Sequence, residues 1–429
     1  MQLKPFNNVS KALSAAACAL LGGGAAQAKA GEAWDVDTAL MLYSETDRVQ
    51  TAEGIVQLSH DFGDEHVFSG KLVLDTLTGA SANGAVPQPS VQTFTRPSGG
   101  GQYSVSAGDT PLDDTFKDTR VQANGQWTQP LSQNFTISAG LHFSNEHDYQ
   151  SFAFNGSLAR DFNHSNTTLS LGLSQAMDVS SPEGGRPVAL SAMVVNNGQF
   201  GSNGAYQRAI DATRLEGEGS RDTTDLILGL TQVMSRNWIT QFNVGLSEVS
   251  GYLNDPYKIV SVVDGEGSAV SQLYESRPDT RSKQFVYLQS KYHLRKSIAD
   301  ISFRFTTDDW GLDSQQLELR YRMPFGAHSY VQPHLRFYQQ SAVDFYHRFL
   351  SAEDSLPDYA SADYRIGEMT ATTVGLKFGH VLAGGNEFSL RLEYYQQQSS
   401  GQASTLSALQ GLELYPTVDA FILQFGYRF

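Results

Sequence analysis

The chain has 429 residues, of which 40% are apolar, 11% are aromatic and only 17% are charged. Plentiful aromatic and β-branched residues exclude a disordered chain. The absence of a mature segment with about 18 consecutive apolar residues excludes a helical membrane protein. The formal net charge of −15 argues against non-specific nucleic-acid binding. A single cysteine, Cys18, excludes a disulfide framework and a cysteine-based metal site.

The first 28 residues have the composition of an export signal. A lysine-containing n-region precedes a small, apolar segment at 12–21, and an A-x-A cleavage motif ends at Ala28. Cleavage there predicts a signal peptide of residues 1–28 and a mature domain of residues 29–429 without cysteine. A second cleavage site after Ala30 also fits the motif.

Along the mature chain, apolar and polar residues alternate in runs that turn residues separate. Such period-two alternation predicts strands with one apolar face. Clear runs lie at 34–42, 71–75, 120–127, 135–143, 169–174, 226–230, 238–246, 301–306, 317–322, 334–338, 373–378, 388–394 and 421–429. Weaker runs lie at 53–62, 149–162 and 283–295, which brings the expected number to about 16 strands.

The connections between these runs alternate between short and long. In an outer-membrane barrel the short turns face the periplasm and the long loops face the outside. An even number of strands then places both chain ends in the periplasm, in agreement with an exported N-terminus. The short connections are 62–66, 130–134, 163–166, 236–237, 295–297, 324–328 and 382–386, and the long ones are 78–115, 178–221, 253–282, 341–364 and 399–416.

These patterns predict an all-β fold, a transmembrane antiparallel β-barrel of about 16 strands. A sheet in hydrocarbon must close on itself, because lipid cannot hydrogen-bond an open edge. A soluble sandwich or propeller also alternates, but it needs more frequent turns and no contrast between short and long connections. Aromatic residues near the strand ends fit an interfacial girdle: Trp34, Trp127, Trp238, Tyr321, Tyr394 and Tyr427.

The last strand resembles the C-terminal signal of Gram-negative outer-membrane β-barrels. Phe425 and Tyr427 alternate with other residues, and the chain ends on Phe429. In that class the barrel-assembly machinery reads the terminal strand. The resemblance therefore implies the same partner here, and the outer membrane of a Gram-negative bacterium as the location.

Most of the mature chain resembles an uncharacterised proteobacterial family of outer-membrane barrels. The resemblance rests on the segments 116–120, 127–131 and 144–149 and on the terminal strand. It supplies no activity and no site residues. Members of this family are encoded near flavin-transferase and thioredoxin-like proteins, which implies a link to envelope redox or cofactor traffic.

Positive residues gather on the polar face of the last predicted strands. In a barrel this face lines the lumen, where a basic wall raises the local concentration of anions. An opposing acidic wall is expected from Asp35, Asp37, Asp75 and Asp118. The alternative is that these charges pair and plug the lumen. The predicted pore-lining residues are Arg304, Glu318, Arg320, Arg322, His334, Arg336, Lys377, Arg391, Glu393 and Arg428.

Other constellations are weaker. Acidic loop residues, such as those at 109–118, could hold Ca²⁺, but they lack EF-hand spacing and read as a solvated surface. His60 and His66 flank a turn without the spacing of a known metal site. His147 and Asp148, with a nearby serine, could form a hydrolase set at the rim, although serine is common here. The expectation is therefore no metal, no cofactor and no enzyme.

The sequence favours a porin-like passive channel for small hydrophilic solutes, with a mild preference for anions. The alternative is a non-conducting structural or docking barrel that binds an envelope partner, such as a redox or cofactor-related protein. Expected partners of the barrel are outer-membrane lipid and lipopolysaccharide, and no nucleic acid. Porins of this size also lead us to expect a homo-oligomer, by analogy of fold alone.

Overall fold

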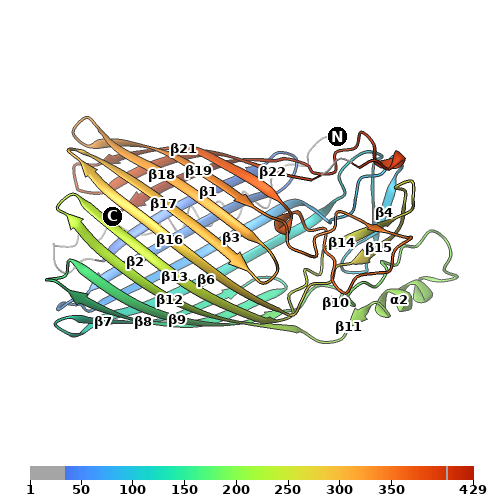
Figure 1. The fold of residues 1–429 in the computed structure, drawn as a ribbon, viewed down its shortest axis with the longest axis horizontal. Coiled ribbons are helices and arrows are strands. Elements are labelled where there is room, and N and C mark those ends of the chain that lie inside the picture. The colour runs from blue at the N-terminus through green and yellow to red at the C-terminus, as the bar shows by residue number, and fades with distance from the viewer. Residues whose placement is uncertain (1–33, 402–403) are drawn as a thin grey trace.

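The computed structural model describes residues 34–401 and 404–429, in which sixteen strands form one closed antiparallel barrel (Figure 1). This confirms the predicted all-β barrel and its strand number. The predicted signal peptide, residues 1–28, lies outside the described residues. Among the described residues, no helix has the length and hydropathy that a bilayer crossing requires.

The barrel strands follow the chain around the wall, and smaller strands occur only in the connections between them. The barrel consists of β1 (Asp35–Glu45), β2 (Gln50–Asp61), β3 (Val67–Ala82), β6 (Leu112–Ser132), β7 (Phe135–Asn145), β8 (Tyr149–Phe162), β9 (Thr167–Ser180), β12 (Gly219–Ser235), β13 (Trp238–Gly251), β16 (Thr280–Leu294), β17 (Ser297–Asp308), β18 (Asp313–Phe325), β19 (Ser329–Gln340), β21 (Met369–Val381), β22 (Glu387–Ser399) and β23 (Val418–Arg428).

The first and last strands close the ring. β1 pairs with β23 from Asp37 opposite Arg428 to Glu45 opposite Ala420. The Phe429 backbone N–H donates to the Val36 carbonyl over 2.9 Å, one residue beyond this ladder. Each strand therefore has two neighbours, and no open edge must be satisfied in a bilayer.

Side chains alternate between an exposed apolar outer face and a polar lumen. Phe303, Leu317 and Leu335 are 39%, 47% and 47% exposed on the outside. Near the short-turn end, Trp34 and Trp127 lie on either side of Phe62, at ring distances of 6.3 and 5.5 Å. This arrangement agrees with the predicted aromatic girdle and with an apolar band that faces lipid.

The five long connections all leave the same end of the barrel, as the sequence predicts, and they are folded rather than open loops (Figure 1). We name them together the outer cap: residues 83–111, 181–218, 252–279, 341–368 and the described part of 400–417. The outer cap contains β4 (Gln92–Thr95), β5 (Gln102–Val105), β10 (Arg186–Pro187), α2 (Asn203–Asp211), β11 (Arg214–Leu215), β14 (Ile259–Val263), β15 (Ala269–Tyr274), β20 (Leu350–Ser351) and the 3₁₀ turns η1 (Tyr364–Ile366) and η2 (Ser407–Leu409).

The outer cap has apolar cores of its own. Val260 and Leu273 of one loop pack with Leu350 of another. Val86 and Leu409 belong to a second core that joins three loops. Each fully buried side chain of this size contributes about 1.5–3 kcal/mol, which is enough to hold the loops in a defined shape.

Candidate functional site

All ten predicted pore-lining residues lie on the inward face of β17, β18, β19, β21, β22 and β23. Their sequence neighbours on these strands, such as Leu319 and Leu376, are exposed on the outer face. The inward face brings Glu318, His334 and Glu393 together from three strands. The luminal wall is thus the first candidate site.

His334 lies at the centre of an ion network on this wall. Its Nε2 is 2.8 Å from a Glu318 oxygen, and its Nδ1 is 2.8 Å from a Glu393 oxygen. Arg320 pairs with Glu318, and an Arg391 nitrogen lies 3.7 Å from Glu393. The wall is therefore less basic than the list of its residues suggests, because part of its charge is compensated locally.

Four other cations on the wall form no direct ion pair with a described residue. In the described part of the chain, no carboxylate lies within 4.0 Å of the Arg304, Arg322, Arg336 or Lys377 nitrogens. Arg336 instead donates to the Thr373 hydroxyl over 3.2 Å. These four cations place positive charge on this side of the lumen, from mid-wall to the short-turn end.

Of the residues expected to form an acidic wall, Asp75 on β3 and Asp118 on β6 lie across the ring from β17 and β18, whereas Asp35 and Asp37 on β1 do not. Because β1 pairs with β23, Asp35 and Asp37 lie beside Arg428, at 3.6 and 3.9 Å. Asp75 pairs with Arg120 over 2.5 Å. Barrel closure thus turns residues from distant parts of the sequence into neighbours, which alternation alone does not show.

A segment of the outer cap crosses the outer mouth of the barrel. We name residues 252–263 the crossing segment. Its Tyr257 hydroxyl donates to Asp148, between β7 and β8. Its Asp255 accepts from Arg365, between β19 and β21. The segment leaves the end of β13 at Gly251, and its Ile259 N–H donates to the carbonyl of Asn83, just beyond β3, over 2.8 Å. Because β13 and β3 are far apart in the ring, the crossing segment runs across the mouth.

A buried ion network fastens the crossing segment to its surroundings. Arg365 pairs with Asp363 over 2.7 Å, and Arg277 joins Asp363 to Glu275 over 2.8 and 2.6 Å. Burial raises the pKa of Glu275 to about 6, although Arg277 acts to lower it. Burial also opposes ionisation of Asp363, but Arg365 and Arg277 hold the pKa of this carboxyl well below its usual range.

The same network has no signal in the sequence pattern. Asp255, Glu275, Arg277, Asp363 and Arg365 all come from long connections, where charged residues usually face solvent. Only the packing of two connections against each other buries them. Nothing in the sequence around these five residues distinguishes them from the solvated charged residues of the same loops.

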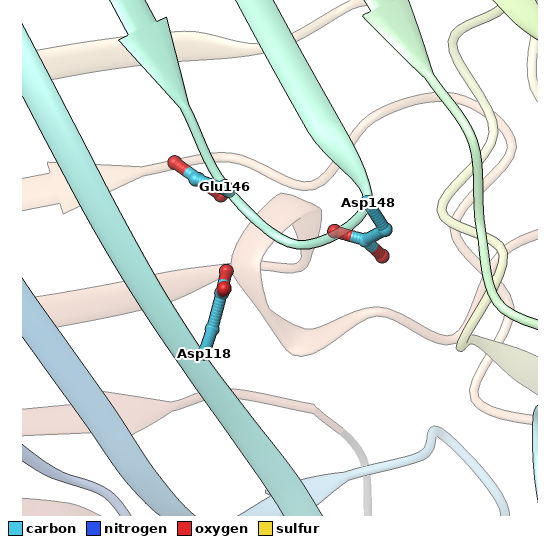
Figure 2. A group of neighbouring side chains, drawn as sticks. All are labelled: Asp118, Glu146 and Asp148. Atoms are coloured by element: carbon cyan, nitrogen blue, oxygen red, sulfur yellow. The ribbon is translucent and has the colours of Figure 1, made fainter.

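Three carboxylates meet at the outer end of β6 and at the β7–β8 connection (Figure 2). Oxygens of Asp118, Glu146 and Asp148 lie within 4.8 Å of one another, a spacing at which carboxylates can hold a divalent cation. The acidic stretch at 109–118 includes the first of them, but the sequence does not indicate the other two as its neighbours. Burial, with the Asp118 charge, raises the pKa of Glu146 to about 7.

This raised pKa predicts a pH-dependent cost. Ionised Glu146 lowers the free energy of unfolding. This loss of stability is complete above about pH 7 and vanishes below pH 4.5, the ordinary pKa of a glutamate. With a chelator present, Glu146→Gln is expected to raise the midpoint of heat-modifiable gel migration by about 2 °C or more at pH 8.5. The midpoint should be unchanged at pH 4.

The control for this experiment is Glu216→Gln, which removes an exposed carboxylate from the outer cap. It should leave the midpoint unchanged at both pH values. An equal shift of the Glu146→Gln variant at pH 4 and pH 8.5 would show that the effect does not come from ionisation.

A family model described as "Protein of unknown function (DUF3570)" matches residues 10–429, nearly the whole chain. The chain belongs to this family. The match confirms the resemblance to an uncharacterised barrel family. Among curated proteins, none matches this DUF3570 chain.

The solved structures to which this DUF3570 chain is similar have very low sequence identity to it. The siderophore receptor PirA from Pseudomonas aeruginosa is 8% identical with a TM-score of 0.41, over 92% of this chain and 62% of that chain. The outer membrane protein opdK from Pseudomonas aeruginosa is 8% identical with a TM-score of 0.38, over 92% and 98%. OccK3 (OpdO) from the same organism is 8% identical with a TM-score of 0.40, over 92% and 95%. The chain thus spans about three fifths of the siderophore receptor's length.

Proposed function

We propose that this DUF3570 protein is an outer-membrane channel through which small hydrophilic solutes diffuse, with a preference for anions. The observation that carries the proposal is the set of luminal cations without carboxylate partners: Arg304, Arg322, Arg336 and Lys377. A barrel of this strand number is wide enough for an aqueous channel unless something fills it.

The mechanism is electrostatic. Fixed positive charges on a low-dielectric wall raise the local concentration of anions and lower their barrier to passage. In the network around His334, carboxylates and cations compensate each other. The network therefore contributes little net charge to the wall. The crossing segment narrows the outer mouth and limits the flux.

The proposed location is the outer membrane, with the short turns in the periplasm and the outer cap outside. The apolar outer face would contact lipid and lipopolysaccharide, and the barrel-assembly machinery would read the terminal strand. Phe425, Tyr427 and Phe429 support this role because they share the outward parity of β23, and Phe425 and Phe429 are 39% and 38% exposed.

Reversal potentials in a planar bilayer test the proposal. Under a tenfold salt gradient, the wild type should show stepwise openings with an anion-biased potential. Arg336→Glu and Lys377→Glu should each shift that potential towards cations by about 5–10 mV, because each changes the luminal charge by two units. The control Arg208→Glu makes the same change on the exposed face of α2 and should not shift it.

Two results would contradict this proposal. Unchanged selectivity in both luminal variants would exclude the cationic wall as the selective element. Complete silence from a barrel that heat-modifiable migration shows to be folded would exclude the channel. The protein would then act as a docking barrel.

A further inference from the structure

A pocket of about 400 Å³ opens into the lumen at its short-turn end. Lys296 lines it from the β16–β17 turn, Arg322 from β18, and His328 and Tyr330 from the next turn and β19. We propose that this pocket binds the phosphate or carboxylate group of a small anionic solute. The inference rests on the proposed function, since it names the class of solute that passes through the lumen.

A fixed aromatic ring forms the base of the pocket. Tyr330 is only 5% exposed, and its hydroxyl donates to Glu387 over 2.5 Å. The ring lies against Gly379, where a Cβ atom would come within 2.2 Å of a ring carbon. Any side chain at 379 would therefore displace the ring, and glycine lets Tyr330 lie flat on the wall.

The guanidinium of Arg322 stacks on this ring, with its Cζ atom 3.6 Å from the ring centroid. Stacking occupies the face of the guanidinium and leaves the N–H donors at its edge for other partners. Within the described residues, no carboxylate lies within 4.0 Å of Arg322. The donors are thus oriented and available for an oxyanion, which two parallel hydrogen bonds can hold.

Neighbouring groups add to this preference. The Lys377 ammonium lies 5.8 Å from the centroid of the same ring, and Lys296 and His328 line the pocket itself. The Glu387 carboxylate, which accepts from Tyr330, keeps its negative charge and opposes this preference, but it does not line the pocket. The volume falls in the range of pockets for small molecules, about 300–1,000 Å³. The site therefore fits inorganic phosphate, a phosphate monoester or a small organic acid.

The chain offers a matched control on the same wall. Arg304 stacks on Phe285 with its Cζ atom 4.3 Å from the ring centroid, and Phe285 in turn lies against Gly245. This second stack is also luminal and without a carboxylate partner, but it does not line the pocket. A variant of Arg304 therefore distinguishes binding at the pocket from the general electrostatic attraction of anions into the lumen.

Calorimetry on the refolded full mature chain in detergent micelles at low salt tests the inference. The two probes are inorganic phosphate and succinate. The wild type should bind at least one of them saturably, and the probe that binds identifies the oxyanion. Arg322→Gln and Gly379→Ala should each weaken that binding about tenfold, equivalent to about 1.4 kcal/mol. Arg304→Gln should stay within about twofold.

Heat-modifiable migration shows which variants are folded, and only folded variants are compared. Arg322→Lys keeps the positive charge but loses the planar pair of N–H donors. It should weaken binding less than Arg322→Gln does. Absence of saturable binding for both probes would overturn the inference. Equal losses of affinity in Arg322→Gln and Arg304→Gln would also overturn it, because the anion would then respond to the overall luminal charge and not to a specific site.

This test is independent of conduction. Saturable binding by a barrel that is silent in a bilayer would support the pocket and contradict the channel. Stepwise openings from a barrel that binds neither probe would support the channel and contradict the pocket.

Discussion

Replacing Arg365 with alanine is expected to raise the single-channel conductance of the refolded barrel about twofold or more, because residues 252–258 of the crossing segment lose their ion pair with the β19–β21 connection. Arg365 neutralises both Asp255 of the crossing segment and Asp363 of that connection. Without the guanidinium, the two carboxylates repel each other. Because the Arg365 side chain is 52% exposed, solvent screening keeps the cost of its loss below the ~3–5 kcal/mol that is typical of a fully buried pair.

The remaining contacts of the crossing segment run to the rim and, through β14, to the β19–β21 connection itself, where Val262 and Val263 pair with Leu350 and Ser351 of β20. Tyr257 still holds Asp148, and Lys258 still donates to the carbonyl of Ala82. We therefore expect residues 252–258 to loosen on the side of the β19–β21 connection, while β14 stays paired with β20 and the barrel stays folded. Conductance should rise and open-channel noise should increase.

The control for this variant is Arg208→Ala, which removes an exposed arginine from α2. Its conductance should match that of the wild type. If Arg365→Ala also conducts like the wild type while it migrates as a folded barrel, the crossing segment does not limit the flux.

Replacing Arg348 with alanine is expected to expose the outer cap to proteases and to leave the barrel intact. The Arg348 guanidinium donates to three backbone carbonyls, those of Gly84, Ala85 and Leu414, over 2.7, 3.2 and 2.7 Å. It thereby joins three separate loops. Hydrogen bonds from a charged donor contribute about 1.5–3 kcal/mol each, so the cap should lose several kcal/mol.

Limited proteolysis of the reconstituted protein measures this loss. Cleavage within 83–111 and 400–417 should be about tenfold faster or more in Arg348→Ala, since local opening sets the rate. The control Arg186→Ala also removes two guanidinium bonds to carbonyls, those of Glu216 and Gly217, but at the surface. An equal increase in both variants would contradict a special role of Arg348.

The pairing of the luminal charges could not be predicted from the sequence, although their inward orientation could. Period-two alternation placed all ten predicted residues on the inward face, because successive side chains of a strand point to opposite sides. It could not tell which of them are neutralised. Glu318 bonds to His334 and Arg320, whereas Arg336, directly opposite it in the ladder, bonds to Thr373.

The folded structure of the outer cap is the largest feature that the sequence did not predict. Glycine-, serine- and proline-rich stretches mark 78–115 and the other long connections as loops, but no local pattern indicates that they share cores. Val260 and Leu350 are close only because both connections return over the same mouth. The acidic composition of these loops suggested a solvated surface and gave no sign of the network around Asp363.

The sequence by itself determined the class of fold, the strand number, the end at which the long loops lie and the inward parity of the polar residues. These features depend on local periodicity and turn chemistry, which act over about ten residues. The tertiary structure alone decided the charge pairs, the pocket at Arg322 and the crossing segment. They depend on register across strands, on closure of β1 against β23, and on contacts between loops far apart in the chain.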